Sequence, residues 1–253
     1  MILNRISNAI RKQDWFTVIL EFVIVVVGIF VGLQANEWAL ERQDRKQELA
    51  ALERLFLESK NAHELLNENL QHTLHMNQMR RNAVQFADSN LPVPENELPL
   101  KIGINTLPYF PTVILVSVAY DELKSSGQMQ LIRSALLRDQ IAGFYVDLIR
   151  HIQFQQDLAD SSVRFFEAYQ RHVIWDYNPD SKTTDILLST YNWESLRADE
   201  GFIFQIIGLL RNQLVAEQAL VDLRDQAMSL CENLGDIIGR SCGSPGPAIE
   251  PES

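Results

Sequence analysis

The stretch FTVILEFVIVVVGIFVGL, residues 16–33, decides how this chain is organised. It is apolar except for one threonine and Glu21. About 20 apolar residues in a helix that rises about 1.5 Å per residue cross a hydrocarbon core about 30 Å thick. Trp15 and Trp38 flank the stretch, and indole rings favour the membrane interface. The sequence therefore predicts a transmembrane helix over residues 15–38.

Three other interpretations of this stretch compete with an anchor. A cleavable signal peptide would place its cleavage site at Leu33-Gln34-Ala35, but signal-peptide cores run only about 7 to 15 residues, and Glu21 is out of place in one. A buried helix that is apolar all round needs a large protein to cover it. The same length disfavours a re-entrant segment. The transmembrane interpretation is preferred to all three.

The charges beside the helix predict its orientation. Basic residues lie on both sides and balance in number: Arg5, Arg11 and Lys12 before it, and Arg42, Arg45 and Lys46 after it. The leading tail has Asp14 as its only acid, whereas several acids are interleaved with the trailing basic residues. We therefore expect residues 1–14 to be a short cytoplasmic tail. The large domain then lies outside the cytoplasm, which in a bacterium means a single-pass inner-membrane protein with a periplasmic domain.

Composition limits the partners of this domain. The chain has 253 residues, enough for an anchor and one domain, and a formal net charge of −11. No concentrated basic stripe is present, which argues against nucleic acid. Cys231 and Cys242 are the only cysteines. They either close a small disulfide loop in an oxidising compartment or remain two free thiols, and neither has zinc-site spacing.

Residues 39–240 predict an all-α extracytoplasmic domain that starts with a long helix over residues 39–88, where Gly and Pro are missing. Apolar residues recur there at steps of three and four and form one stripe: Leu49, Leu52, Leu55, Phe56, Ala62, Leu65, Leu66, Leu70, Leu74 and Met79. This spacing fits a coiled-coil stalk as well as a helix of a bundle. The stripe must in either case pack against another helix.

The rest of the domain predicts a loop and then further helices, which together with the long helix form an antiparallel bundle of about four helices. The loop, residues 89–111, is rich in proline. In the bundle, residues 112–240, a first helix follows the loop and ends at Gly127. Its first residues, VILVSV, also fit a strand, but the polar residues after them favour a helix.

Two longer periodic stretches complete the predicted bundle, over residues 132–175 and 199–238. Asn178-Pro179-Asp180 separates them as a turn. The last residues, 241–253, are rich in Gly, Pro and Ser and predict a disordered tail.

The membrane helix carries the main candidate for a functional contact. A carboxylate inside a bilayer costs about 2.5 to 3.5 kcal/mol at the centre, so Glu21 is a functional hypothesis by default. Steps of four and three place it on one helix face with small residues: Glu21, Val25, Gly28, Gly32 and Ala35. We call this face the anchor seam. Its small-xxx-small spacing favours association with another membrane helix, from a second copy or from another protein; the alternative is that glycine is common in membrane helices.

A second cluster has metal-ligand chemistry. Glu64, Glu68, His72 and His75 share a helix face, and carboxylates with neutral imidazoles suit zinc. A complete site needs ligands from a second element, for which His151 and His172 are the other histidines considered. The competing interpretation is a solvated face with helix-stabilising pairs, and it is preferred. We therefore predict no metal and no cofactor.

Two motifs resemble a widespread bacterial family of single-pass membrane proteins of uncharacterised function. The first lies in the anchor and consists of Glu21, Gly28, Leu33-Gln34, Asn36 and Trp38. The second is YDELKSSG, residues 120–127, followed by Leu131-Ile132 and Leu136. Gly32 departs from the alanine of the family pattern but stays small. The resemblance implies one amino-terminal anchor and a helical carboxy-terminal domain, and it implies no activity.

These observations predict a non-enzymatic, membrane-anchored interaction or sensor module. The alternative is an accessory subunit of an ion-coupled membrane complex, in which Glu21 is a titratable group beside a multi-span partner. A metal-dependent hydrolase that uses Glu68, His72 and His75 is the least favoured class.

Overall fold

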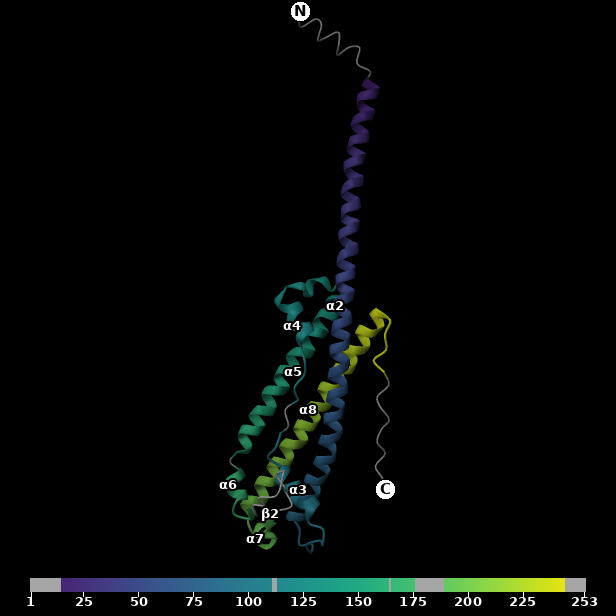
Figure 1. Cartoon of the computed structure of the whole chain (residues 1–253). Coiled ribbons are helices and arrows are strands. Elements are labelled where there is room, and N and C mark those ends of the chain that lie inside the picture. The colour runs from purple at the N-terminus through teal and green to yellow at the C-terminus, as the bar shows by residue number, and fades with distance from the viewer. Residues whose placement is uncertain (1–14, 111–112, 164, 176–188, 244–253) are drawn as a thin grey trace, which may run out of the picture. The chain divides into compact units, whose positions relative to one another are not determined.

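The structure is a computed structural model, and it describes residues 15–110, 113–163, 165–175 and 189–243 (Figure 1). The predicted cytoplasmic tail, the turn at Asn178-Pro179-Asp180 and residues 244–253 of the predicted disordered tail lie outside these ranges. The chain divides into two compact units, Met1–Ala51 and Leu52–Ser253.

The first unit contains the beginning of helix α2, Trp15–Ala87. Every described side chain from Ile19 to Gln47 is exposed. Of the helices in the described ranges, α2 is the one long and apolar enough to cross a membrane, by length and composition. The Arg42 guanidinium lies over the exposed Trp38 ring, 5.4 Å from its centroid.

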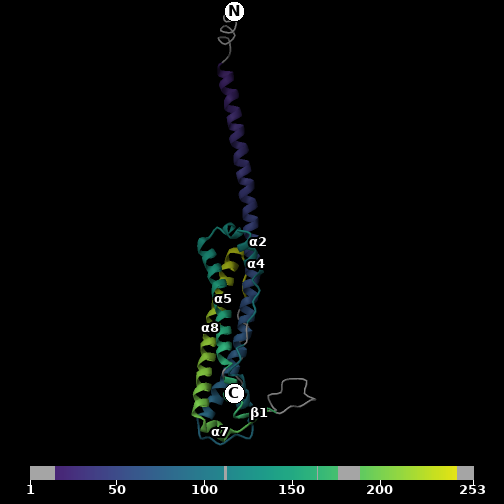
Figure 2. The same ribbon diagram turned by 90° about the vertical axis from the view of Figure 1, so that its left-hand side faces the viewer.

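The second unit is all-α with one small pair of strands. Its long helices are α2 from Leu52 onward, α5 (Ala135–Ser162) and α8 (Glu200–Ile238), which run alongside one another (Figures 1 and 2). Much of the predicted stripe is buried here, namely Leu52, Leu55, Phe56, Ala62, Leu66 and Leu70, whereas Leu65 and Leu74 are exposed. The later part of α2 is therefore a helix of the bundle.

Helix α8 runs antiparallel to both of its neighbours. His63 and Asn77 of α2 contact the backbone oxygens of Arg224 and Gln213, respectively, so the two helices run in opposite directions. The Gln140 side chain near the start of α5 bonds to Ser229 and Asn233 near the end of α8. Helices α2 and α5 are thus parallel to each other. This corrects the predicted antiparallel four-helix bundle, because the described residues between α2 and α5 contain no long helix that makes the return.

Shorter elements make that return. Helix α3, Leu98–Thr106, lies inside the predicted proline-rich loop, because Pro99 occupies the first turn, where its missing N–H is not needed. The helix predicted from Thr112 is only α4, Val118–Ser125, because β-branched residues dominate positions 113–116. Gly127 adopts φ 71°, which confirms the predicted helix stop. A 3₁₀ turn, η1 (Gln128–Leu131), leads on to α5.

The helix predicted over residues 132–175 also ends early. After α5 come α6 (Phe165–Tyr169) and the strand β1 (Val173–Trp175), which pairs antiparallel with β2 (Ser189–Tyr191). A β-branched and aromatic sequence favours a pleated conformation here once a partner strand is present. Helix α7, Trp193–Ala198, then precedes α8, and the Asp199 side chain caps α8 by accepting from Phe202 N at 3.0 Å.

A hydrophobic core at this end of the unit joins the end of α2 to α3, α6, both strands, α7 and the start of α8. Gly103 allows α3 to lie directly on α2, because a Cβ atom at this position would be 2.5 Å from both the Ala83 Cβ and the Met79 backbone oxygen. This close approach fixes the residues that follow α3 beside α2.

Candidate functional site

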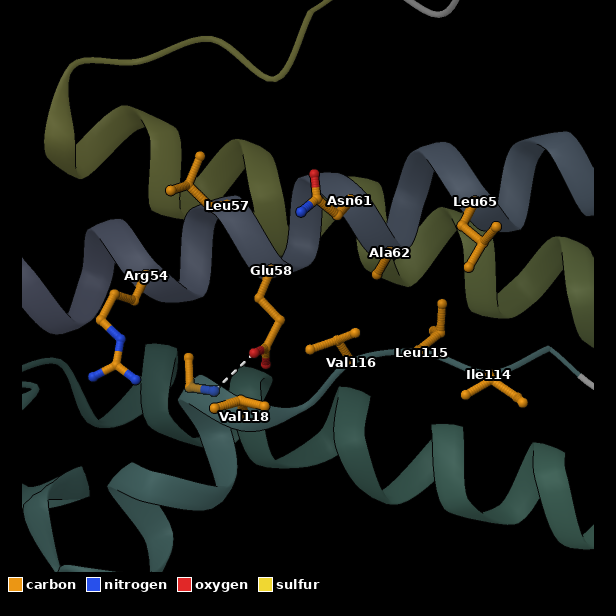
Figure 3. Close-up of a pocket in the computed structure, with 11 residues that line it drawn as sticks. Arg54, Leu57, Glu58, Asn61, Ala62, Leu65, Ile114, Leu115, Val116 and Val118 are labelled. Atoms are coloured by element: carbon orange, nitrogen blue, oxygen red, sulfur yellow. Dashed lines mark hydrogen bonds between the residues drawn. The ribbon is translucent and has the colours of Figure 1, made fainter.

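A surface groove of about 340 Å³ lies between α2 and the irregular segment that precedes α4 (Figure 3). We call it the α2 groove. Its lining is mostly apolar and comprises Arg54, Leu57, Glu58, Asn61, Ala62, Leu65, Ile114, Leu115, Val116, Val118 and Ala119. The volume lies at the lower end of the range for ligand pockets, which is roughly 300 to 1,000 Å³.

The irregular segment presents a row of apolar side chains to solvent. Ile114, Val116 and Val118 are 81%, 67% and 63% exposed, whereas Val113 and Ala119 are buried. Side chains that alternate between two faces are typical of an extended strand. Large aliphatic side chains that gather on one exposed surface indicate an interaction site, in contrast to single ones scattered over a protein.

The backbone of this segment also lacks regular pairing. Among the described residues, no backbone–backbone hydrogen bond involves positions 113–116. Peptide N–H and C=O groups of a protein nearly always find hydrogen-bond partners. In the α2 groove these groups are left to water or to an added chain, beside a row of exposed aliphatic side chains.

Glu58 is the polar group at the base of the groove. Its side chain points from α2 towards the segment (Figure 3) and is 9% exposed. One carboxylate oxygen accepts from the Ala119 backbone N–H at 2.8 Å, and the other accepts from the Tyr145 hydroxyl of α5. Burial, followed by this contact, raises the pKa of Tyr145 above its usual range, so the phenol stays protonated and donates. Glu58 thus joins α2, α4 and α5.

An exposed ion pair forms the rim of the groove. Arg54 bonds to Glu122 of α4. The contact with Glu122 raises the pKa of Arg54, and the contact with Arg54 lowers the pKa of Glu122. Solvent screens such a pair, so it adds little stability. The pair connects α2 to α4 at this end of the groove.

The predicted anchor seam has no partner within the described chain. Glu21, Val25, Gly28, Gly32 and Ala35 are all exposed. A Cβ atom added at Gly28 or at Gly32 would have no heavy atom of the described residues within 4 Å. Association through this face stays a prediction that needs another molecule. Trp15 lies in α2, but its side chain is outside what the structure describes.

The predicted metal candidates do not converge. Glu64, Glu68, His72 and His75 are exposed on α2, and the described residues contain no group of three His, Cys, Asp or Glu side chains placed to hold a metal ion. His151 is buried on α5, and neither of its ring nitrogens has a hydrogen-bond partner among the described residues.

His172 lies in a second polar cluster. Its Nε2 is 3.0 Å from Asp199 Oδ2, and its Nδ1 is 3.2 Å from Ser195 Oγ. These residue types form the triad of serine hydrolases, but there the aspartate contacts Nδ1 and the serine contacts Nε2. Asp199 also caps α8, and the contact with His172 lowers its pKa. The cluster therefore joins the residue before β1 to α7 and to the cap of α8, and it is best explained as a structural one.

The cysteines form a disulfide in this structure. Cys231 is buried in α8 and is bonded to Cys242 beyond the helix end, with their Cα atoms 6.0 Å apart. Of the two alternatives that the sequence allows, the structure contains the closed loop.

Sequence reasoning missed the α2 groove and its acid. Glu58 lies in a polar and charged stretch of α2 and shows no motif. The signal for the segment is present in the β-branched residues of VILVSV, which favour a strand-like conformation, although the polar residues that follow it favour a helix. No protein-family model, curated protein or solved structure matches the chain.

Proposed function

We propose that this protein is a non-enzymatic, membrane-anchored interaction module, whose α2 groove binds an extended apolar segment of a partner protein. The observation that carries the proposal is the row of exposed Ile114, Val116 and Val118 on a segment with unpaired backbone groups. An extended peptide that adds to such a segment gains main-chain hydrogen bonds, and its alternate side chains enter the apolar groove.

The chemistry of the groove favours this occupant. Its walls are aliphatic, its base holds a carboxylate whose oxygens already have donors, and its rim charges neutralise each other. A highly charged ligand finds no unpaired countercharge in this groove. An uncharged aliphatic strand fits both the alternating side chains and the free backbone groups.

The anchor is the second part of the proposal. Residues 15–38 cross the bacterial inner membrane, with the amino terminus in the cytoplasm and the folded unit in the periplasm. The apolar character of this stretch supports the crossing. The disulfide between Cys231 and Cys242 supports the orientation, because disulfides persist in oxidising compartments and are rare in the cytosol.

Site-specific photocrosslinking in the native membrane tests the groove. A photoreactive phenylalanine at Ile114 is expected to capture a partner, and mass spectrometry of the adduct is expected to map the contact to an extended apolar segment of that partner. Phe204, which is 79% exposed on α8, is the matched control position and is expected to give no such adduct.

A Val116→Asp substitution provides the matched variant. The side chain is exposed, so the fold should tolerate the change, whereas a charge in the apolar row should abolish the adduct at Ile114. Adducts only with a second copy of the chain, equal adducts at both positions, or an adduct that survives Val116→Asp would each contradict the proposal.

The exposed anchor seam favours one second candidate, the accessory subunit of an ion-coupled complex. In that case Glu21 contacts a multi-span partner inside the membrane. Gentle detergent extraction of wild type and Glu21→Gln side by side separates the two functions. A multi-span protein that is lost only from the variant favours the accessory subunit.

A further inference from the structure

Arg80 is a buried cation without a countercharge among the described side chains. It lies on α2, is 4% exposed, and none of the described carboxylates lies within ion-pair distance of its guanidinium. Glu217 of α8 shares Asn77 with Arg80 as a partner, but it accepts from Asn77 Nδ2 at 2.7 Å and pairs with Arg81. Burying a charge is costly unless another charge compensates it.

Neutral acceptors hold the guanidinium in place. Nη1 donates to Asn77 Oδ1 and to Gln213 Oε1, both at 2.7 Å. Nη2 donates to the Thr106 backbone oxygen at 2.8 Å. Gln213 is held in turn, because its Nε2 donates to the Leu107 and Tyr109 backbone oxygens. Side chains from α2 and α8 and the backbone at the end of α3 thus fix the orientation of this cation.

The two longest of its hydrogen bonds lie on one edge. Nε donates to Thr106 Oγ1 at 3.3 Å, and Nη2 donates to the Tyr109 backbone oxygen at 3.4 Å. Nε and Nη2 form the edge of a guanidinium that binds a carboxylate through two parallel hydrogen bonds. Thr106 and Tyr109, which supply these weak acceptors, both line a neighbouring cavity.

The cavity has the size and chemistry of a small-ligand site. Its volume is about 300 Å³, and Arg80 itself lines it. The other lining residues supply polar groups and apolar surface and comprise His72, Thr73, Met76, Thr106, Tyr109 and Phe110. Burial lowers the pKa of Arg80 to about 10, so the side chain is still a cation at neutral pH.

We propose that this cavity, the Arg80 cavity, binds a small carboxylate ligand with an apolar or aromatic body. The carboxylate exchanges the two long hydrogen bonds at the Nε and Nη2 edge for charge-assisted ones, and it supplies the negative charge that the site lacks. The apolar body contacts Met76 and Phe110. This site is separate from the α2 groove, and the proposal does not depend on the function assigned to the groove.

The test uses the full-length chain in detergent, with sodium benzoate as the probe and benzamide as its uncharged control of the same shape. The ionic strength is held constant with sodium chloride. At a free concentration of about ten times its Kd, benzoate is expected to raise the thermal unfolding midpoint by roughly 3 to 6 °C, and the shift should follow the saturation of one site. Benzamide is expected to produce no shift.

A carboxylate built into the cavity provides the second measurement. Met76 precedes Arg80 by one helical turn, so the Glu of Met76→Glu is spaced to pair with the guanidinium. This variant is expected to unfold at a higher temperature without any ligand and to lose its response to benzoate. Gln71→Glu adds the same charge at an exposed position of the same helix and should keep the response.

Three outcomes would overturn the proposal. They are equal shifts with benzoate and benzamide, no saturable shift with benzoate, or a Met76→Glu variant that responds as wild type does. Arg80→Gln should also abolish the response to benzoate, but it removes several structural hydrogen bonds. If Arg80→Gln does not fold, the result for Met76→Glu decides whether the cavity binds a carboxylate.

Discussion

Replacing Gly103 by alanine tests the contact that positions the Arg80 cavity. The added Cβ would lie 2.5 Å from the Ala83 Cβ and from the Met79 backbone oxygen. Ordinary contacts between such atoms are about 3.5 to 4.0 Å, so α3 must move away from α2 by about 1 Å. Overpacking of this kind costs about 1 to 3 kcal/mol.

The same displacement weakens the hydrogen bonds of Arg80 to Thr106, which are 2.8 and 3.3 Å long. A shift of about 1 Å lengthens both donor–acceptor distances beyond the range of a hydrogen bond. Losing hydrogen bonds to a charged group costs roughly another 1.5 to 3 kcal/mol. The higher helix propensity of alanine offsets about 0.5 to 1 kcal/mol. We expect Gly103→Ala to destabilise the folded unit by roughly 1.5 to 5.5 kcal/mol.

Gly143→Ala is the matched control, because Gly143 is exposed in the interior of α5 and an added Cβ would meet nothing within 4 Å. It should stabilise the protein by about 0.5 to 1 kcal/mol. Thermal and urea unfolding of both variants in the same detergent measures the difference. If Gly103→Ala were neutral or stabilising while Gly143→Ala stabilised, the direct packing of α3 on α2 would be refuted.

Two further predictions concern the bundle. Breaking the disulfide by Cys242→Ser should lower the free energy of unfolding by about 3 kcal/mol, because the bond closes a loop with a sequence separation of only 11. Thiol labelling of the intact wild type should detect no free cysteine. Rapid labelling without reductant would contradict both the bond and the periplasmic placement. Burial lowers the pKa of His151 below its usual 6.5, so the unfolded chain binds a proton at this side chain more readily than the folded one. The stability that the neutral His151 contributes should be complete above about pH 6.5 and should fall as the pH drops below that value. His151→Leu should flatten this part of the plot of unfolding free energy against pH, whereas an unchanged slope would assign the effect to other groups.

Features with a local cause were readable from the sequence. The apolar stretch before Leu33, the stop at Gly127 and the long final helix each follow from residues close together in the chain. Helix α3 was missed, because prolines were treated as breaks although one of them begins the helix. The return from α2 to α5 was missed because its path depends on what the β-branched segment packs against.

The candidate sites depend on contacts between residues that are distant in the sequence. Glu58 and Tyr145 are 87 positions apart, and Arg80 and Gln213 are 133 apart, so no spacing rule connects them. Helical periodicity reports which face of α2 is apolar, but it does not report which side chain of another helix that face meets. Neither the polar residues of the α2 groove nor those of the Arg80 cavity have a distinguishing local pattern.

The sequence by itself determined that the chain is helical, that its amino-terminal stretch is apolar enough for a membrane and that one face of α2 must be covered, because helix periodicity and hydrophobicity are local properties. Only the tertiary structure decided that α8 packs against α2, that residues 113–118 form one wall of a groove, and that no described carboxylate pairs with Arg80 beside its cavity. Those features arise from packing and desolvation, which depend on all the neighbours of a residue in space.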